Sequence, residues 1–286
     1  MKHVDAKTTP DRRLFCERSP FAYEISRYKC IVLRNLQDFF SSAKFAKEKE
    51  GEKLPVQVYE HSSLIRRKLG NVDTRLQENK AVNLSLAAPR VTGILIKPGE
   101  IFSFWKLVGA PSQRKGYKAG LAIKKGEPSQ GIGGGMCQFT NLIHWMVLHT
   151  PLDIVEHHHH DRVDLFPDYG RQVPFGTGTS IYYNYLDYRF RNNTDRPFQL
   201  IVYTTETHLC GEIRTTQPLA YSYHIKCEDE FFSKEEGSVY RNNKIYRTIV
   251  DKTTGDTLSK ELIKTNHAKV VYDTSNLTIL EKSALR

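Results

Sequence analysis

One cysteine stands where the sequence combines a glycine run with the start of a helical pattern. Cys137 comes two residues after Gly133, Gly134 and Gly135, and apolar residues then recur at helical spacing. These residues are Phe139, Leu142, Ile143, Met146 and Val147. We therefore expect Cys137 in the first turn of a helix, partly exposed and off the buried face. Unpaired backbone N–H groups and the positive end of the helix dipole lie there, so we expect a lowered thiol pKa and a place for an oxyanion.

Two interpretations of this stretch remain open. In the first, the thiolate is a nucleophile, and the three glycines together with Gln138 bind a substrate that approaches the main chain closely. In the second, Cys137 is a small apolar residue beside a tight loop, which is the usual situation of a free cysteine.

A cysteine nucleophile needs a base within about 3 Å to take its proton. His144 lies seven residues after Cys137, which is about 10 Å along a helix, so we expect it to be structural. The run His157–His160 is the other source of a base. In an extended segment, His158 and His160 face one side and the other two histidines face the opposite side. The sequence therefore predicts that one pair points inward.

Charged residues near this run complete the candidate site. Glu156, Asp161 or Asp168 could orient a histidine ring. Arg171 and Arg189 could hold a substrate carboxylate, because a guanidinium group presents a planar fork of donors. Ordinary exposed charge is the alternative for each arginine.

The composition narrows the class of protein. The chain has 286 residues and a formal net charge of +10, but it carries no nucleic-acid-binding signature. The five cysteines are scattered and form no CxxC pair, which is typical of reduced thiols. The N-terminus lacks the apolar stretch of a secretory signal, and no run of 18 apolar residues predicts a membrane span. We therefore expect a cytoplasmic location.

The pattern along the chain predicts an α+β fold in three parts. Residues 1–82 are expected to be a helical region, with an amphipathic stripe from Phe21 to Ala43 and a short basic helix over His61–Leu69. Residues 83–216 are expected to be a mixed core, in which the Cys137 helix packs against an antiparallel sheet. Residues 217–286 are expected to form a small β appendage.

Several segments together resemble one family. The central segment Gly133–Gln138 resembles the GGG-x-CQ motif of the VanW family, and the resemblance spans roughly residues 85–215. The other matching segments are Lys97–Phe104, Val108–Gly109, Gly116–Tyr117, the E-x-H-x-H segment at Glu156, His158 and His160, and Tyr188–Thr194. The ordered set is specific, whereas a glycine run alone is not.

The resemblance implies a link to glycopeptide resistance and to peptidoglycan metabolism. Some VanW-domain proteins are described as L,D-transpeptidases that cross-link peptidoglycan through a cysteine, which would make Cys137 the nucleophile. The E-x-H-x-H match selects His158 and His160 as the candidate bases. The expected partner is then a peptidoglycan stem peptide or precursor, with no cofactor.

Two other functional interpretations of the sequence stay open, a zinc site and a non-catalytic binding module. The four histidines, an aspartate and the cysteine could bind zinc, although their spacing matches no known zinc signature. Alternatively, the chain is a non-catalytic accessory module that binds a cell-wall peptide or precursor. A covalent adduct on Cys137 would separate an enzyme from a binding module.

Overall fold

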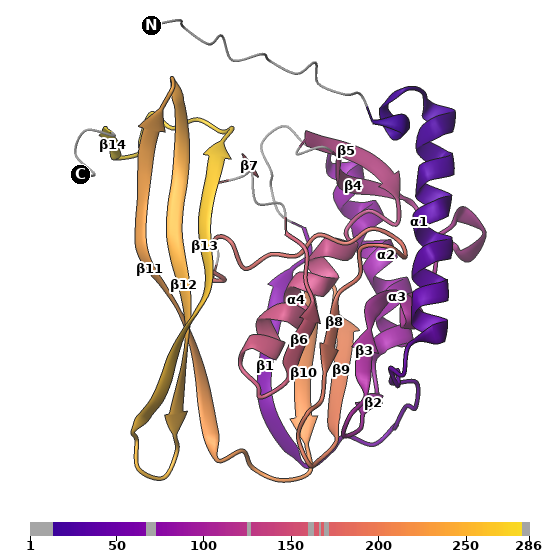
Figure 1. Ribbon diagram of the computed structural model, residues 1–286, viewed down its shortest axis with the longest axis vertical. Helices are drawn as coiled ribbons and strands as arrows, with labels where there is room; N and C mark the ends of the chain where they lie inside the picture. Colours follow the sequence, from indigo (N-terminus) through magenta and orange to yellow (C-terminus); the bar gives the residue numbers. More distant parts are fainter. Residues whose placement is uncertain are drawn as a thin grey trace, which may run out of the picture. The chain divides into compact units, whose positions relative to one another are not determined.

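The computed structural model describes residues 14–66, 73–124, 127–159, 163–165, 167–168 and 172–281, and has the expected α+β fold (Figure 1). The chain divides into two compact units, Met1–Ser42 and Ala43–Arg286. The first unit contains a 3₁₀ turn, η1 (Phe15–Glu17), and one long helix, α1 (Pro20–Phe40). The Ser19 hydroxyl caps α1 by accepting a hydrogen bond from the Ala22 N–H at 3.1 Å, and Pro20 occupies its first turn.

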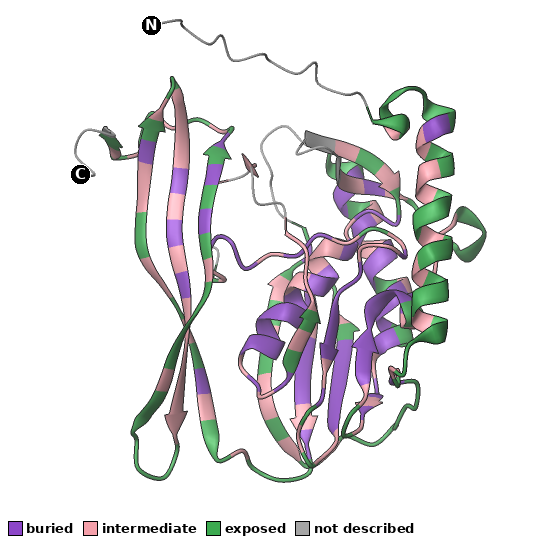
Figure 2. Ribbon diagram, viewed as in Figure 1, coloured by how far each residue is buried: buried purple, intermediate pink, exposed green. Residues whose placement is uncertain are grey.

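An antiparallel sheet with two helices packed against it forms the centre of the second unit. Its strand order is β1-β10-β9-β2. The strands are β1 (Val56–Leu64), β10 (His208–Thr215), β9 (Phe198–Thr204) and β2 (Ile94–Ile96). Helix α2 (Thr74–Val91) contacts β9, and helix α4 (Met136–Leu148) contacts β1 and β10. Apolar side chains between these layers are the main core, and Figure 2 shows this part of the chain as mostly buried.

Smaller elements surround this core. A three-stranded antiparallel sheet has the order β3-β8-β6, and strands β4 and β5 form a hairpin that leads into α4. The bounds are β3 (Ile101–Ser103), α3 (Phe104–Val108), η2 (Gln113–Lys115), β4 (Ala119–Lys124), β5 (Glu127–Ile132), β6 (Asp153–Glu156) and β8 (Arg189–Arg191).

The C-terminal strands form a five-stranded sheet of order β14-β11-β12-β13-β7. Three long antiparallel strands dominate it, and short β7 and β14 pair in parallel at its edges. The bounds are β7 (Val163–Asp164), β11 (Tyr221–Glu235), β12 (Ser238–Asp251), β13 (Thr257–Val270) and β14 (Ile279–Glu281). The expected β appendage is confirmed, with strands longer than the short runs that the sequence suggested.

One expectation for the N-terminal part is wrong. The short basic helix expected over His61–Leu69 does not form at His61–Leu64, which belong to strand β1, and residues 67–69 lie outside the described residues. This strand pairs with β10, about 150 residues later in the sequence, and such long-range pairing leaves no local signal. The boundary expected after residue 82 falls inside α2, whereas the two compact units meet at Ser42 and Ala43.

Candidate functional site

Cys137 lies at the N-terminus of α4, as the helical pattern predicted. It is the second residue of the helix, after Gly135 as N-cap and Met136. Gly135 has φ 105°, in the left-handed region that a residue with a Cβ rarely adopts. The Cys137 residue as a whole is half-buried.

The three glycines before α4 are packed tightly against other parts of the protein. A Cβ on Gly134 would lie 2.3 Å from the carbonyl carbon of Gly120 in β4, and a Cβ on Gly133 would lie 2.5 Å from Pro111. A Cβ on Gly135 would lie 2.3 Å from Cγ of Lys80 in α2. Each glycine therefore has a structural reason for its presence that is independent of any ligand.

Polar side chains from two elements also hold this end of α4 in place. The Asn83 side-chain amide in α2 donates 2.9 Å hydrogen bonds to the carbonyl oxygens of Gly134 and Lys118. The Gln138 side chain donates 2.9 Å hydrogen bonds to Ser63 Oγ and to the carbonyl oxygen of Leu64, at the end of β1. Gln138, expected to bind substrate, thus ties α4 to the central sheet.

One face of α4 meets an irregular segment that contains Thr179 and Ile181. Asn141 lies one turn after Cys137, and its Oδ1 accepts hydrogen bonds from the Thr179 N–H at 2.6 Å and the Thr179 hydroxyl at 2.8 Å. The Thr179 hydroxyl also contacts Thr140 Oγ1 and, at 3.4 Å, the carbonyl oxygen of Cys137. The backbone of Ile181 lies close enough to the Cys137 thiol to influence its pKa. These contacts enclose the sulfur between α4 and the segment.

This enclosure corrects the expectation of a lowered thiol pKa. Burial raises the pKa of the Cys137 thiol, and the hydrogen bonds from the Ile181 backbone and from its own backbone only partly offset the effect. Removing water from around a thiolate therefore outweighs the favourable position at the helix start. At neutral pH the free protein carries Cys137 mainly as the neutral thiol.

The three described histidines of the run, His157–His159, follow strand β6, and the rings of His157 and His158 have different partners. The His157 ring lies on the α4 side, stacked on His144 with ring centroids 4.2 Å apart, and its Nε2 is 2.8 Å from the carbonyl oxygen of Gly178. A Cβ on Gly178 would lie 3.2 Å from His159 Nε2 and 3.7 Å from Asn141 Oδ1. His159 therefore lies beside the turn of α4 that follows Cys137.

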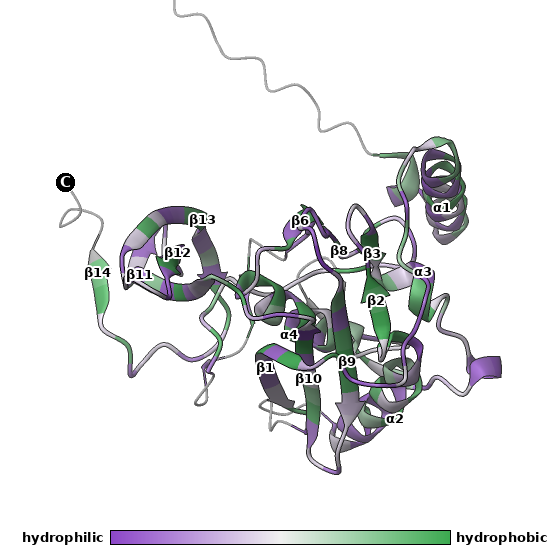
Figure 3. Cartoon of the chain, turned by 90° about the horizontal axis from the view of Figure 1, so that it is seen from below, coloured by the Kyte–Doolittle hydropathy of each residue, from purple (hydrophilic) through white to green (hydrophobic). Residues whose placement is uncertain are grey.

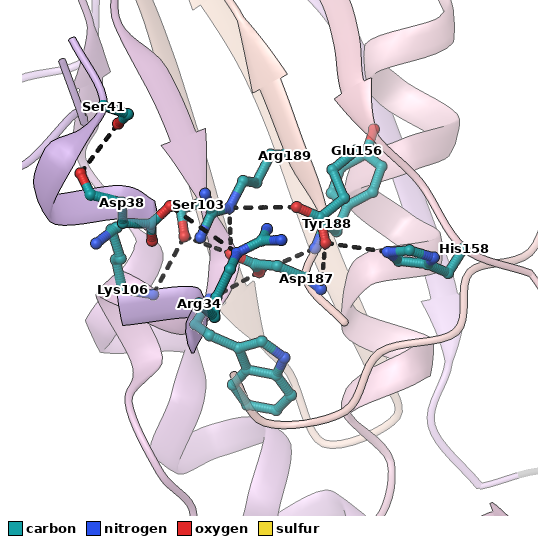
Figure 4. Close-up of polar contacts among 11 residues, drawn as sticks. Arg34, Asp38, Ser41, Ser103, Lys106, Glu156, His158, Asp187, Tyr188 and Arg189 are labelled. Atoms are coloured by element: carbon teal, nitrogen blue, oxygen red, sulfur yellow. Dashed lines mark hydrogen bonds and ion pairs between the residues drawn. The ribbon is translucent and has the colours of Figure 1, made fainter. Parts of the chain in front are cut away.

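His158 points to a different set of groups. Its Nε2 is 3.0 Å from Oε1 of Glu156 (Figure 4), while its carbonyl oxygen accepts a hydrogen bond from the Ser180 N–H. His160 lies outside the described residues. The structure brings His157 and His159, rather than His158, to the face of α4 that carries Cys137.

His144 is a buried structural residue, in agreement with its distance from Cys137 along the helix. It is 2 % exposed, and its Nδ1 is 3.1 Å from the hydroxyl of Tyr188. Burial lowers the pKa of His144 well below its ordinary value, and its electrostatic interactions with His157, His159 and Lys264 lower it further. The ring is therefore neutral at physiological pH.

Arg189, expected to hold a substrate carboxylate, belongs to a buried ionic network. Its Nε lies 2.8 Å from Oδ2 of Asp187 and 3.5 Å from Oε2 of Glu156 (Figure 4). Asp187 is fully buried and also accepts hydrogen bonds from the Ser103 hydroxyl and from the Trp105 and Tyr188 N–H groups. The arginine neutralises this buried carboxylate. Arg171, the other expected carboxylate ligand, lies outside the described residues.

The structure adds Asn141 and Thr179 to the candidate site. Asn141 could have been found from the sequence, because it lies four residues after Cys137 and so shares its helix face. Thr179 gave no such signal, since only the folded chain brings its irregular segment to α4.

Within the part of the chain that the structure describes, no group of three or more His, Cys, Asp or Glu side chains is arranged to hold a metal ion. Among the same residues, no helix has the length and hydrophobicity needed to cross a bilayer.

Comparisons with known proteins agree with the motifs. A model of VanW-like proteins matches residues 79–214. The chain is 35 % identical over 223 residues to the vancomycin B-type resistance protein VanW of Enterococcus faecalis (strain ATCC 700802 / V583), covering 78 % of this chain and 81 % of that protein. It is 33 % identical over 120 residues to the uncharacterized protein YoaR of Bacillus subtilis (strain 168), covering 42 % of this chain and 38 % of that protein. No solved structure matches the chain. The extent of the identity to VanW shows that the chain belongs to the VanW family.

Proposed function

We propose that this protein acts in peptidoglycan metabolism linked to vancomycin resistance, by acyl transfer on a stem peptide through Cys137. The single observation that carries the proposal is the convergence of three segments at the start of α4. Cys137 lies in the first turn, the Ile181 backbone approaches its sulfur, and His159 lies beside the next turn at Asn141. A nucleophile, hydrogen-bond donors and a base are the groups that acyl transfer requires.

The reaction would proceed in two steps, as in an L,D-transpeptidase. The sulfur attacks the carbonyl carbon of a peptide bond, the carbon–nitrogen bond breaks, and the released amine takes a proton. A thioester on Cys137 then reacts with the amine of a second stem peptide, which forms the cross-link and frees the thiol. Backbone N–H groups at the start of α4 would stabilise the oxyanion of each tetrahedral intermediate.

Because burial keeps the thiol protonated, this mechanism needs a base during the attack rather than a preformed thiolate. We assign that role to His159, in place of His158 and His160. His158 instead bonds to Glu156, whose Oε1 also accepts the Asp187 N–H at 2.8 Å. This pair would fix the extended segment so that the neighbouring ring faces α4.

One observation favours a second candidate function, a non-catalytic accessory module. The raised thiol pKa and the packed glycines are also what a structural cysteine beside a tight loop would give. Such a module would bind a cell-wall peptide or precursor without forming a covalent bond.

Mass spectrometry after incubation with tetrapeptide-containing muropeptides tests the proposal. We expect a mass increase on Cys137 equal to a thioester-linked stem peptide, and none in Cys137→Ala. His159→Ala should slow the formation of the thioester on Cys137 by about 100-fold or more, whereas His158→Ala should slow it less. If the peptide binds equally to the wild type and to Cys137→Ala without any adduct, the accessory module is correct and the enzyme is not.

A further inference from the structure

Helix α1 carries a continuous apolar stripe that the described residues of its own unit leave exposed, apart from an edge contact between the rings of Phe39 and Phe40. Six residues spaced by three or four positions form the stripe: Phe21, Ile25, Tyr28, Val32, Leu36 and Phe39. All six are exposed, and Phe21 and Phe39 are 75 % and 80 % exposed. Among the described residues of the first unit, Ala22 alone is buried, so the unit has no core to cover the stripe.

The side chains of α1 favour a lipid surface as the partner that covers the apolar stripe. The stripe contains three aromatic rings, and Phe40 adds another that is 79 % exposed. Figure 3 shows α1 nearly end-on, with both hydrophobic and hydrophilic residues around its axis. Among the described residues, no helix is apolar enough to cross a bilayer, so α1 would lie in the plane of the interface. Aromatic side chains on one face and charged ones on the other are typical of helices that bind in this way.

The charge of the same unit selects the kind of lipid. Residues 1–42 contain eight Lys or Arg and five Asp or Glu, a net charge of +3, within a chain of net charge +10. Anionic headgroups attract such a segment, whereas two copies meeting through α1 would bring like net charges together. We propose that α1 is an interfacial helix that attaches this protein to the surface of an anionic membrane, with its apolar stripe inserted among the lipids.

Vesicle sedimentation of the full-length chain tests this proposal. We expect it to pellet with vesicles that mix phosphatidylglycerol and phosphatidylcholine, and to bind pure phosphatidylcholine vesicles at least about tenfold more weakly. The triple variant Phe21→Ser, Tyr28→Ser, Phe39→Ser should lose at least about tenfold in affinity for the anionic vesicles, because it removes the inserted rings. Tyr23→Ser is the matched control, since it removes one ring from the opposite face of α1, and it should bind like the wild type.

Three results would overturn the proposal. The first is equal binding of the triple variant and the wild type, or no binding of either. The second is a dimer in light scattering that the triple variant abolishes, which would mean that a second copy covers the stripe. The third is a fall of several degrees in the melting temperature of the triple variant without vesicles, which would mean that the chain itself covers it. An unchanged melting temperature together with lost vesicle binding supports the proposal and does not depend on the chemistry of Cys137.

Discussion

Replacing Gly134 with alanine tests whether the glycine run is needed for packing. The new Cβ would lie 2.3 Å, 2.4 Å and 2.7 Å from the carbonyl carbon, oxygen and Cα of Gly120. All three are backbone atoms of strand β4, so no side chain can rotate to make room. The start of α4 would have to separate from β4, which strains the hydrogen bond between Asn83 and the Gly134 carbonyl oxygen. Overpacking of this kind costs about 3 kcal/mol, or roughly 6–12 °C in melting temperature for a domain of this size.

Gly131→Ala is the matched control, because it makes the same chemical change three residues earlier. Its Cβ would have Ala122 Cβ as nearest neighbour at 3.7 Å, which is ordinary contact. We expect a change in unfolding free energy of about 1 kcal/mol or less. Urea unfolding followed by the fluorescence of the two tryptophans, Trp105 and Trp145, measures both variants, because both rings are buried in the second unit. Stabilities within 0.5 kcal/mol (about twofold in the unfolding constant) would refute the packing explanation.

Three further predictions concern single side chains. Cys137→Ala should cost only about 1 kcal/mol of stability in thermal unfolding, and a much larger loss would make the cysteine structural. Asp187→Ala leaves the Arg189 charge buried without its closest carboxylate. We expect the unfolding free energy measured in urea to fall by about 3–5 kcal/mol. The double variant Asp187→Ala, Arg189→Met should recover part of this loss, because it removes the unpaired charge as well. Burial lowers the pKa of His149 to about 4. The folded protein therefore keeps this ring neutral at pH values where the unfolded chain protonates it. The resulting contribution to the unfolding free energy, about 3 kcal/mol, is fully present above pH 6.5 and is lost as the pH falls towards 4. His149→Gln should lose less stability than the wild type between pH 7 and pH 4.5, and equal losses would contradict the assignment.

Local patterns in the sequence determined several features of this protein correctly. The period of the apolar residues predicted the helix that begins beside Cys137, and the alternation of an extended chain predicted that the histidines divide between two sides. Both depend on backbone geometry within a few residues, which each segment carries with it. The ordered motifs, including the segment Gly133–Gln138, also indicated the family.

The tertiary structure decided which of these residues meet, and in what environment. The side of the histidine run that faces α4 depends on Gly178 and Ser180, which lie about 20 residues further along the chain. The thiol pKa of Cys137 is raised because a distant segment removes water from it, an effect that outweighs the local influence of the helix start. Arg189 similarly lies inside the fold, where Glu156 of strand β6 approaches it in addition to its sequence neighbour Asp187. Long-range packing sets burial and charge pairing, whereas the sequence around a residue sets only the direction of its side chain.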